Sequence, residues 1–254
     1  MAYIYSSFSH KGHRKKNEDC ILIRSAKIGS DDICMGIVCD GVGGLRKGEV
    51  ASNSAVEFMS DWFERIALKS SCDIEYDYIK KSMIKNTHKA NMMIAQYGER
   101  NNLRCATTLC AFILFNEKFF AINVGDSRIY ICANGLHQLS TDDSAGNGVL
   151  TQCVGLGDEI TVNTDEGLLR DGEALFICTD GFYADMDSNA VQNMLENATY
   201  DNCVAAVEDI VCKKAQVCAD DNITAGFVRY IENVDTKNAT ARFFKSLLPN
   251  KNNK

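Results

Sequence analysis

Residues 33–44 read Ile-Cys-Met-Gly-Ile-Val-Cys-Asp-Gly-Val-Gly-Gly, an apolar run that stops at Asp40 and continues into a glycine-rich segment. The run is rich in β-branched residues, which predicts a buried strand over Ile33–Cys39. Ile21–Ala26 has the same character, and the turn-forming residues 29–32 separate the two runs, so we expect a β-hairpin. Because glycine lets the backbone come close to a ligand, the carboxylate of Asp40 stands where a site can form.

Hydrophobic periodicity divides the rest of the chain into helices and strands. Apolar residues at helical spacing over 49–68 and 74–97 predict two long helices, which a short polar connection makes antiparallel neighbours. Shorter helices are expected at 191–195 and 204–217. Strands are expected at 109–115, 119–124, 129–132, 160–162, 174–178 and 223–230, and Asn134-Gly135 predicts a hairpin turn. Because hairpins join the strands, the order predicts an α+β fold with antiparallel sheets and helices outside them.

The composition is that of a globular protein in a reducing compartment. The 254 residues are 46% hydrophobic and 24% charged with a net charge of −7, which excludes wholesale disorder and argues against nucleic-acid binding. No apolar run reaches the length of a membrane span, and the N-terminus is no secretory signal. The twelve cysteines include no CxxC pair and no Cys followed six positions later by Arg, so they predict neither a zinc ribbon nor a cysteine-phosphatase loop. Without an export signal they indicate free thiols in the cytoplasm.

Acidic residues recur at the ends of the predicted strands. Asp40, Asp126 and Asp180 each adjoin a glycine there, Asp221 precedes the last strand, and Glu18-Asp19 precede the first hairpin. Carboxylates gathered in one place repel each other unless cations hold them, and hard oxygen ligands suit Mg²⁺ or Mn²⁺. For any single strand-end Asp, a turn-forming role is the simpler interpretation. Their recurrence favours a metal site without requiring one.

Seven short motifs occur in one order between about residues 10 and 230. They are R-x-x-N-E-D at 14–19, D-G-x-G-G at 40–44 with G-E-x-A-S at 48–52, A-T-T-L at 106–109, V-G-D-S-R at 124–128, L-T-x-x-x-G at 150–155, T-D-G-F at 179–182 and D-N-I-T at 221–224. Each motif is weak by itself. In this order they resemble the metal-dependent protein serine/threonine phosphatases of the PP2C (PPM) type, in a bacterial-like form with a short flap.

The resemblance implies a four-layer αββα sandwich of two antiparallel sheets flanked by antiparallel helix pairs. It also implies hydrolysis of phosphoserine and phosphothreonine by a water that bridges two divalent metals, which loses a proton near neutral pH. Asp40 would bridge the two Mn²⁺ or Mg²⁺ ions. Asp180 and Asp221 would bind the first ion, and Glu18 and the backbone carbonyl of Gly41 would serve the second.

The resemblance assigns three further roles. Asp126 would bind a third, weaker ion together with Asp180, Asp19 would orient metal-bound waters, and Arg14 would hold the substrate phosphate. A guanidinium matches two phosphate oxygens and stays charged, although Arg14 also reads as a solvated residue of the basic patch 11–16. Val42 replaces a histidine that some members use as a general acid, so that role is unassigned. The short segment 144–149 predicts an open site, weaker third-metal binding and relaxed peptide selectivity.

The organisation and partners follow from the same resemblance. We expect a phosphatase domain over 1–231 and a polar tail over 232–254, in which 241–248 can form a short amphipathic helix. Phosphoprotein substrates of a Ser/Thr kinase are expected, with a cytoplasmic monomer and no membrane or nucleic-acid partner. Two alternatives stay open. One is a catalytically silent metal-bound sensor or scaffold, which is disfavoured because every metal-binding carboxylate is present. The other is a phosphohydrolase of small phosphomonoesters, which the open site makes more plausible than usual.

Overall fold

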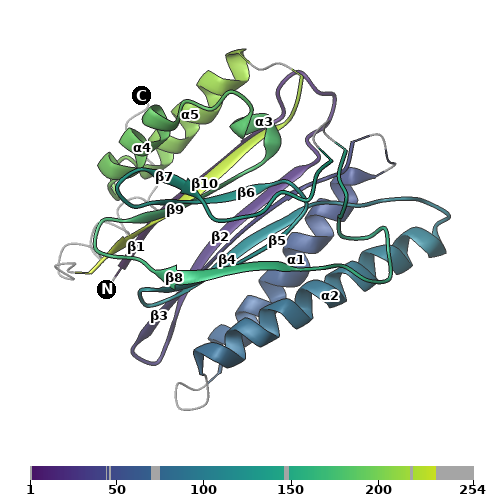
Figure 1. Cartoon of the computed structure of the whole chain (residues 1–254), viewed down its shortest axis with the longest axis horizontal. Helices are drawn as coiled ribbons and strands as arrows, with labels where there is room; N and C mark the ends of the chain where they lie inside the picture. Colours follow the sequence, from purple (N-terminus) through teal and green to yellow (C-terminus); the bar gives the residue numbers. More distant parts are fainter. Residues whose placement is uncertain are drawn as a thin grey trace, which may run out of the picture.

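Two antiparallel five-stranded sheets pack face to face, and helices cover the outer side of each (Figure 1). The computed structural model describes residues 2–43, 45, 47–69, 75–145, 149–217 and 220–232. The elements are β1 (Ala2–His10), β2 (Asp19–Ile28), β3 (Asp31–Asp40), α1 (Gly48–Ala67), α2 (Tyr76–Arg100), β4 (Leu109–Phe115), β5 (Lys118–Val124), β6 (Arg128–Cys132), β7 (Leu136–Gln138), β8 (Asn163–Leu168), β9 (Ala174–Cys178), α3 (Asp180–Tyr183), α4 (Ser188–Asn197), α5 (Cys203–Val217) and β10 (Ile223–Ile231).

The four layers enclose three apolar cores. One sheet has the strand order β1-β10-β9-β6-β7 and packs against α4 and α5, and the other has the order β2-β3-β4-β5-β8 and packs against α1 and α2. The third core lies between the sheets. The predicted α+β class and αββα layering are confirmed.

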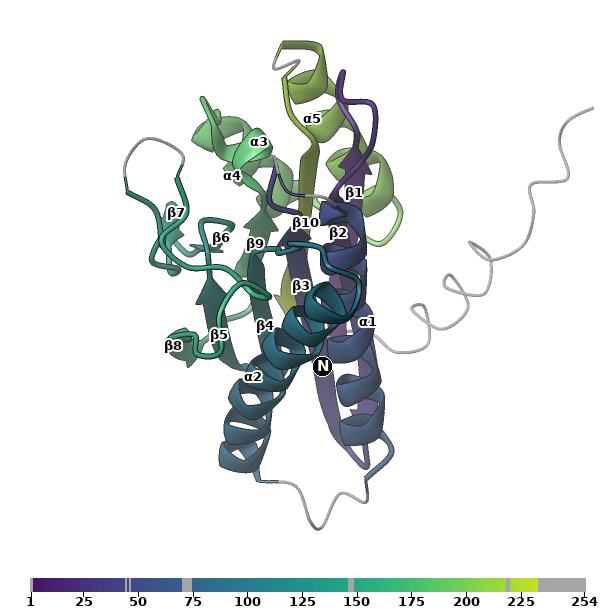
Figure 2. The ribbon, with the colours of Figure 1, turned by 90° about the vertical axis from the view of Figure 1, so that its right-hand side faces the viewer.

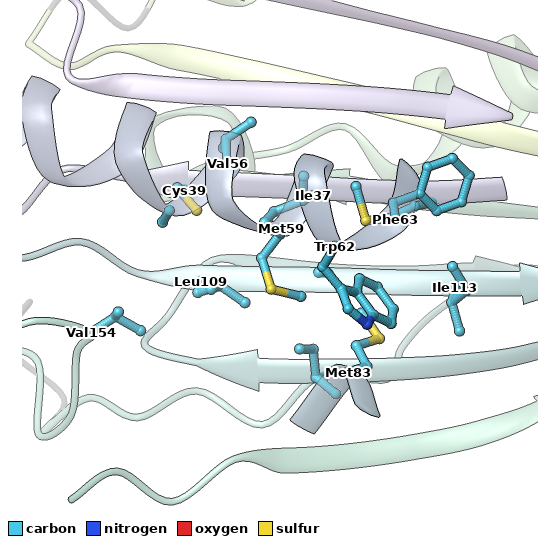
Figure 3. Packing of buried hydrophobic residues seen from close by; sticks show 14 of the residues in the cluster. Ile37, Cys39, Val56, Met59, Trp62, Phe63, Met83, Leu109, Ile113 and Val154 are labelled. Carbon is cyan, nitrogen blue, oxygen red and sulfur yellow. The ribbon is translucent and has the colours of Figure 1, made fainter. Parts of the chain in front are cut away.

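β3 lies between β2 and β4 in its sheet and contributes to two of these cores. It is buried from Ile33 to Cys39, as its apolar run predicts. Alternate side chains point to opposite faces of a strand, so Met35 and Ile37 pack under α1 and α2 while Val38 faces the other sheet. Figure 3 shows Met59 of α1 over this face of the sheet. Each large side chain buried in this way contributes about 1.5–3 kcal/mol to folding.

The structure differs from the sequence prediction at two strands. β1 was not predicted, because its serine-rich sequence is only partly buried; it pairs with β10 along its whole length, from Ala2↔Ile231 to His10↔Ile223. The strand predicted at 160–162 is wrong, since β8 begins at Asn163 and is a polar edge strand held by pairing with β5. The other predicted elements lie within a few residues of their observed bounds. In the described ranges no helix is long and apolar enough to cross a membrane.

Strand pairing brings distant acidic residues to one end of the two sheets. The β2–β3 register places Asp19 opposite Asp40. In the other sheet, β9 leads into α3 at Asp180, and Asp221 lies two residues before β10 begins. Figure 2 shows the β1–β2 connection and the connections after β3 and β9 together at the upper end of the molecule.

Candidate metal centre

A cavity of about 400 Å³ opens at this end of the sheets, and residues of both sheets line it. The lining residues are Arg14, Glu18, Asp40, Gly41, Val42, Gly43, Thr108, Asp126, Val149, Leu150, Cys153, Leu156, Asp180, Asp221 and Asn222. Every residue predicted for the site is among them except Asp19, which is buried and pairs with Asp40 across the two strands. Folding therefore gathers the complete predicted set.

The carboxylates of Asp19, Asp40 and Asp180 interact with one another in the site; Asp19 is buried, and Asp40 and Asp180 are partly buried. Burial raises the pKa of Asp40 well above its usual range, and the negative charges of Asp19 and Asp180 raise it further. Asp40 and Asp180 interact, and two ionised carboxylates in this position repel each other unless a proton or a cation compensates their charge. Burial likewise raises the pKa of Asp19 to about 7.

The oxygens of these buried groups are only partly satisfied. Thr179 Oγ1 donates a hydrogen bond of 2.9 Å to Oδ2 of Asp19. Oδ1 of Asp19 and Oδ1 of Asp180 are buried and have no hydrogen-bond partner in the part of the chain that the structure describes. Buried polar atoms are normally paired, so these two oxygens indicate a missing partner. The cluster carries negative charge that protons or cations must compensate.

Two glycines bring the start of α1 against the side chain of Glu18. A Cβ at Gly48 would lie 2.9 Å from Oε1 of Glu18, and a Cβ at Gly41 would lie 2.5 Å from the carbonyl carbon of Gly48. Neither distance leaves room for a side chain. The backbone amide of Gly41 donates to the carbonyl of Glu18 at 3.1 Å. Burial and the charge of Glu49 raise the pKa of Glu18.

Arg14 lies at the rim of the cavity and contacts a carboxylate of the site. Its Nη2 atom is 3.2 Å from Oδ1 of Asp221, and its Nε donates to the carbonyl of Asp220. The Arg14 side chain is 47% exposed, so the guanidinium faces both the carboxylate and solvent. Burial and the charge of Asp180 raise the pKa of Asp221, while Arg14 acts in the opposite direction. Arg14 therefore lines the cavity and contacts Asp221, and its role in holding phosphate is a proposal.

Asp126 lies in a turn that a neighbouring carboxylate holds. The backbone amide of Gly125 donates to Oδ2 of Asp143 at 3.0 Å, and the amide of Asp143 donates back to the carbonyl of Gly125 at 2.9 Å. Nδ2 of Asn163 donates to Oδ1 of Asp143 at 3.1 Å. Burial and the charge of Asp180 raise the pKa of Asp126 to about 6.

Three residues that support this site were given no role from the sequence. Asn222 is buried; its Oδ1 accepts from the amide of Glu18 at 2.8 Å, and its Nδ2 donates to the carbonyls of Lys11 and Lys16 at 2.9 Å each. Thr179 and Asp143 support Asp19 and Asp126 as described above. Asn222 and Thr179 lie within the quoted motifs, next to Asp221 and Asp180, and that adjacency is the signal that marks them. Asp143 gives no comparable signal.

The ligand set is not a closed coordination shell. Across the described residues, no three His, Cys, Asp or Glu side chains form a compact group ready to hold a metal ion. The donors nevertheless suit a hard divalent cation, because they are carboxylates whose charge is unbalanced and two of whose buried oxygens are unpartnered. The residues therefore fit a cation site in chemistry, and their individual ligand roles are proposals.

Fold and site together define the chain as an α+β sandwich with an acidic centre between its sheets, and sequence comparison gives its family. Residues 8–224 match the family described as "Protein phosphatase 2C", and the chain belongs to this family. The assignment to the family's serine/threonine phosphatases, made from the motifs, is confirmed. The enzyme class is that of a phosphoprotein phosphatase.

Individual relatives agree with this assignment. The chain is 29% identical over 210 residues to the serine/threonine phosphatase stp of Listeria monocytogenes, covering 74% of this chain and 81% of that protein. A serine/threonine phosphatase from S. agalactiae superposes with a TM-score of 0.77 at 25% identity, over 91% of this chain and all of that one. The catalytic domain of the phosphatase PstP, solved with two manganese ions, superposes with a TM-score of 0.73 at 20% identity, over 91% and 99% of the two chains.

Proposed function

We propose that the protein removes phosphate from phosphoserine and phosphothreonine in the carboxylate-lined cavity, with two divalent cations bound there. The observation that carries the proposal is the group of Asp19, Asp40 and Asp180, which has two buried oxygens without a partner among the described residues and negative charge that only protons or cations can balance. At neutral pH, bound cations can balance this charge while the carboxylates stay ionised, whereas balance by protons requires the carboxylates to be protonated. The manganese in PstP supports Mn²⁺, and Mg²⁺ has the same preference for oxygen ligands.

For the ligand roles we propose those that the family resemblance implies, and the placement of the side chains around one cavity supports them. Asp40 is central and would contact both ions, with Asp180 and Asp221 on the first. Glu18 and the carbonyl of Gly41 would serve the second, because two glycines bring them together. Asp126 would hold a third and weaker ion with Asp180. When bound, the ions would polarise the phosphoryl group and lower the pKa of the attacking water.

The remaining residues position the substrate and handle protons. Thr179 fixes Oδ2 of Asp19, which leaves Oδ1 to accept a hydrogen bond or carry a proton beside the cavity. Arg14 is anchored by Asp221 and is still half exposed, so its guanidinium group can donate hydrogen bonds to two oxygens of a phosphate. Val42 lines the cavity and cannot donate a proton to the leaving oxygen. No side chain is therefore assigned as general acid.

The wider context belongs to the same proposal. We place the enzyme in the cytoplasm as a monomer that opposes a Ser/Thr kinase; the ten described cysteines are all free, which suits a reducing compartment. We propose that the catalytic domain spans 1–231 and that 232–254 is a separate tail. The helix suggested at 241–248 lies outside the described residues.

The test measures metal binding and turnover separately. Asp180→Asn should bind Mn²⁺ more weakly by calorimetry and lose phosphopeptide hydrolysis at least a hundredfold, while its circular dichroism spectrum stays unchanged. Asp201→Asn, an exposed turn residue, is the matched control and should behave as wild type. Full turnover in Asp180→Asn and Asp40→Asn would refute the two-cation assignment. Metal binding without turnover in the wild type would favour a silent scaffold, and hydrolysis of small esters alone would favour the phosphomonoester alternative.

A further inference from the structure

The cavity is lined by apolar residues as well as by carboxylates, and we call its carboxylate-lined part the carboxylate pole. The apolar part, which we call the apolar wall, consists of Val42, Val149, Leu150, Cys153 and Leu156. Val149 is 57% exposed and Leu156 is 39% exposed. Single exposed apolar residues are common on protein surfaces, but these two share the mouth of one polar cavity. An apolar surface at the edge of a charged site is typical of a surface that contacts a ligand.

The backbone that carries Cys153 and Leu156 is firmly anchored. The amide of Val154 donates to the carbonyl of Thr107 at 2.8 Å, and the amide of Thr107 donates back at 3.0 Å. Buried Asn91 of α2 holds the following turn from both ends: its Oδ1 accepts from the amide of Gly155 at 2.7 Å, and its Nδ2 donates to the carbonyl of Gly157 at 2.7 Å. Leu156, between these two points, is therefore presented to solvent on a fixed turn.

Gly155 shows how closely this turn packs on α2. Its φ of +106° is unfavourable for other residues, and a Cβ there would lie 2.5 Å from Cγ2 of Ile94. Val149 and Leu150 are fixed in a similar way. The amide of Ala145 donates to the carbonyl of Val149 at 2.9 Å, and Leu150 forms a β-bridge with Ser144. The apolar wall is thus preorganised, which lowers the entropic cost of binding against it.

Four of the five wall residues lie in the segment between β7 and β8, whereas Arg14 lies in the β1–β2 connection. A phosphate held by Arg14 and the carboxylate pole therefore leaves the apolar wall for the next part of the substrate. A cavity of about 400 Å³ has room for a phosphorylated side chain and part of its neighbour.

We propose that the apolar wall selects phosphopeptides that carry a bulky apolar side chain next to the phosphorylated residue. This inference rests on the proposed function, because that function places the phosphate at the carboxylate pole. It replaces the relaxed peptide selectivity that the short segment 144–149 predicts with a definite preference. Leu156 and Val149 are specificity-determining residues in this proposal, and neither takes part in the chemical step.

The first experiment compares substrates on the Mn²⁺-loaded wild-type enzyme. The reference is N-acetyl-phosphothreonine amide, and the test peptides place Leu, Gly or Asp before or after phosphothreonine in an otherwise constant sequence. We expect Leu on one side to raise kcat/KM about tenfold over Gly at the same position, mainly through KM. No turnover of any substrate would refute the proposed function itself. Turnover of the reference with equal kcat/KM for Leu, Gly and Asp peptides would refute only the apolar wall.

The second experiment changes the wall. Leu156→Asp should abolish the advantage of Leu peptides over Gly peptides, and it should make a peptide with Lys in the same position a better substrate than the Leu peptide. The readout is the ratio of kcat/KM values between peptides measured on the same variant. Leu168→Asp is the matched control, because Leu168 is an exposed leucine at the end of β8 and outside the cavity. An equal loss in both variants, or a Leu preference that survives in Leu156→Asp, would overturn the proposal. Phenyl phosphate is measured as a further substrate. If Leu156→Asp lowers kcat/KM for phenyl phosphate alone, the proposal is also overturned, because the wall would then bind small aryl esters.

Discussion

Asn222 joins the β1–β2 connection to the start of β10, and replacing it by alanine should loosen both. Its side chain satisfies three backbone groups, the amide of Glu18 and the carbonyls of Lys11 and Lys16. An unpaired buried group costs about 1–3 kcal/mol, and a group that water can reach costs less. The Glu18 amide lies next to the buried cluster, whereas Lys11 and Lys16 are exposed. We therefore expect Asn222→Ala to lose about 3 kcal/mol of stability.

The same substitution should weaken the site more than it weakens the fold. At about 2–4 °C per kcal/mol, the melting temperature should fall by roughly 6–12 °C. Because Asn222 fixes Glu18 directly and Arg14 through the connection that carries it, the Mn²⁺ concentration for half-maximal activity and the KM for phosphopeptide should both rise about tenfold. A merely structural residue would lower the melting temperature and leave both values unchanged at a temperature where the variant is folded.

Thermal melting with and without Mn²⁺ and an Mn²⁺ titration of activity measure these effects. Asn197→Ala is the matched control, since the Asn197 side chain makes one exposed hydrogen bond within α4. Asn222→Asp keeps an acceptor for the Glu18 amide but lacks the donor to the two carbonyls, so it should fall between Asn222→Ala and wild type in melting temperature. A melting temperature within 1 °C of wild type together with an unchanged Mn²⁺ requirement would show that the three hydrogen bonds do not support the site.

Two further predictions concern charge and the third ion. Folding raises the pKa of Asp19 to about 7 and that of Asp126 to about 6. In EDTA, the folded protein therefore holds protons that the unfolded chain releases above about pH 4. The free energy of unfolding should fall as pH rises from about 4 to 7, by about 4 kcal/mol for Asp19 alone. Melts at pH 5.5 and 7.5 test this, and a melting temperature that rises with pH would contradict it, whereas saturating Mn²⁺ should reduce the slope. Asp143→Ala removes the acceptor for the Gly125 amide. The Mn²⁺ concentration at the midpoint of the weakest binding step should therefore rise several-fold, while the midpoints of the tighter steps stay unchanged. An equal rise in every midpoint would assign Asp143 a general structural role.

The strand that opens the sequence analysis shows what local pattern can predict. The apolar run up to Cys39 specifies a buried strand through side-chain character alone, and Asp40 must then stand at its end. Register follows as well, because a hairpin with a tight turn after Ile28 leaves one pairing that buries both runs. Asp19 opposite Asp40 is a consequence of that register. The buried half of the site was therefore predictable from hydrophobic pattern and one turn.

The exposed half of the site depends on an element that the pattern did not predict. β1 is serine-rich and partly buried, so hydrophobic periodicity gives it little signal, and its position comes from main-chain pairing with β10 over more than 200 residues of separation. That pairing ends at His10↔Ile223, so the residues after β1 must lie beside those before β10. It is this juxtaposition that places Arg14 on Asp221 and gives Asn222 its partners in the β1–β2 connection. The sequence could supply the types of residue needed for a phosphate ligand, but the distance between Arg14 and Asp221 is fixed by a long-range register that no local pattern specifies.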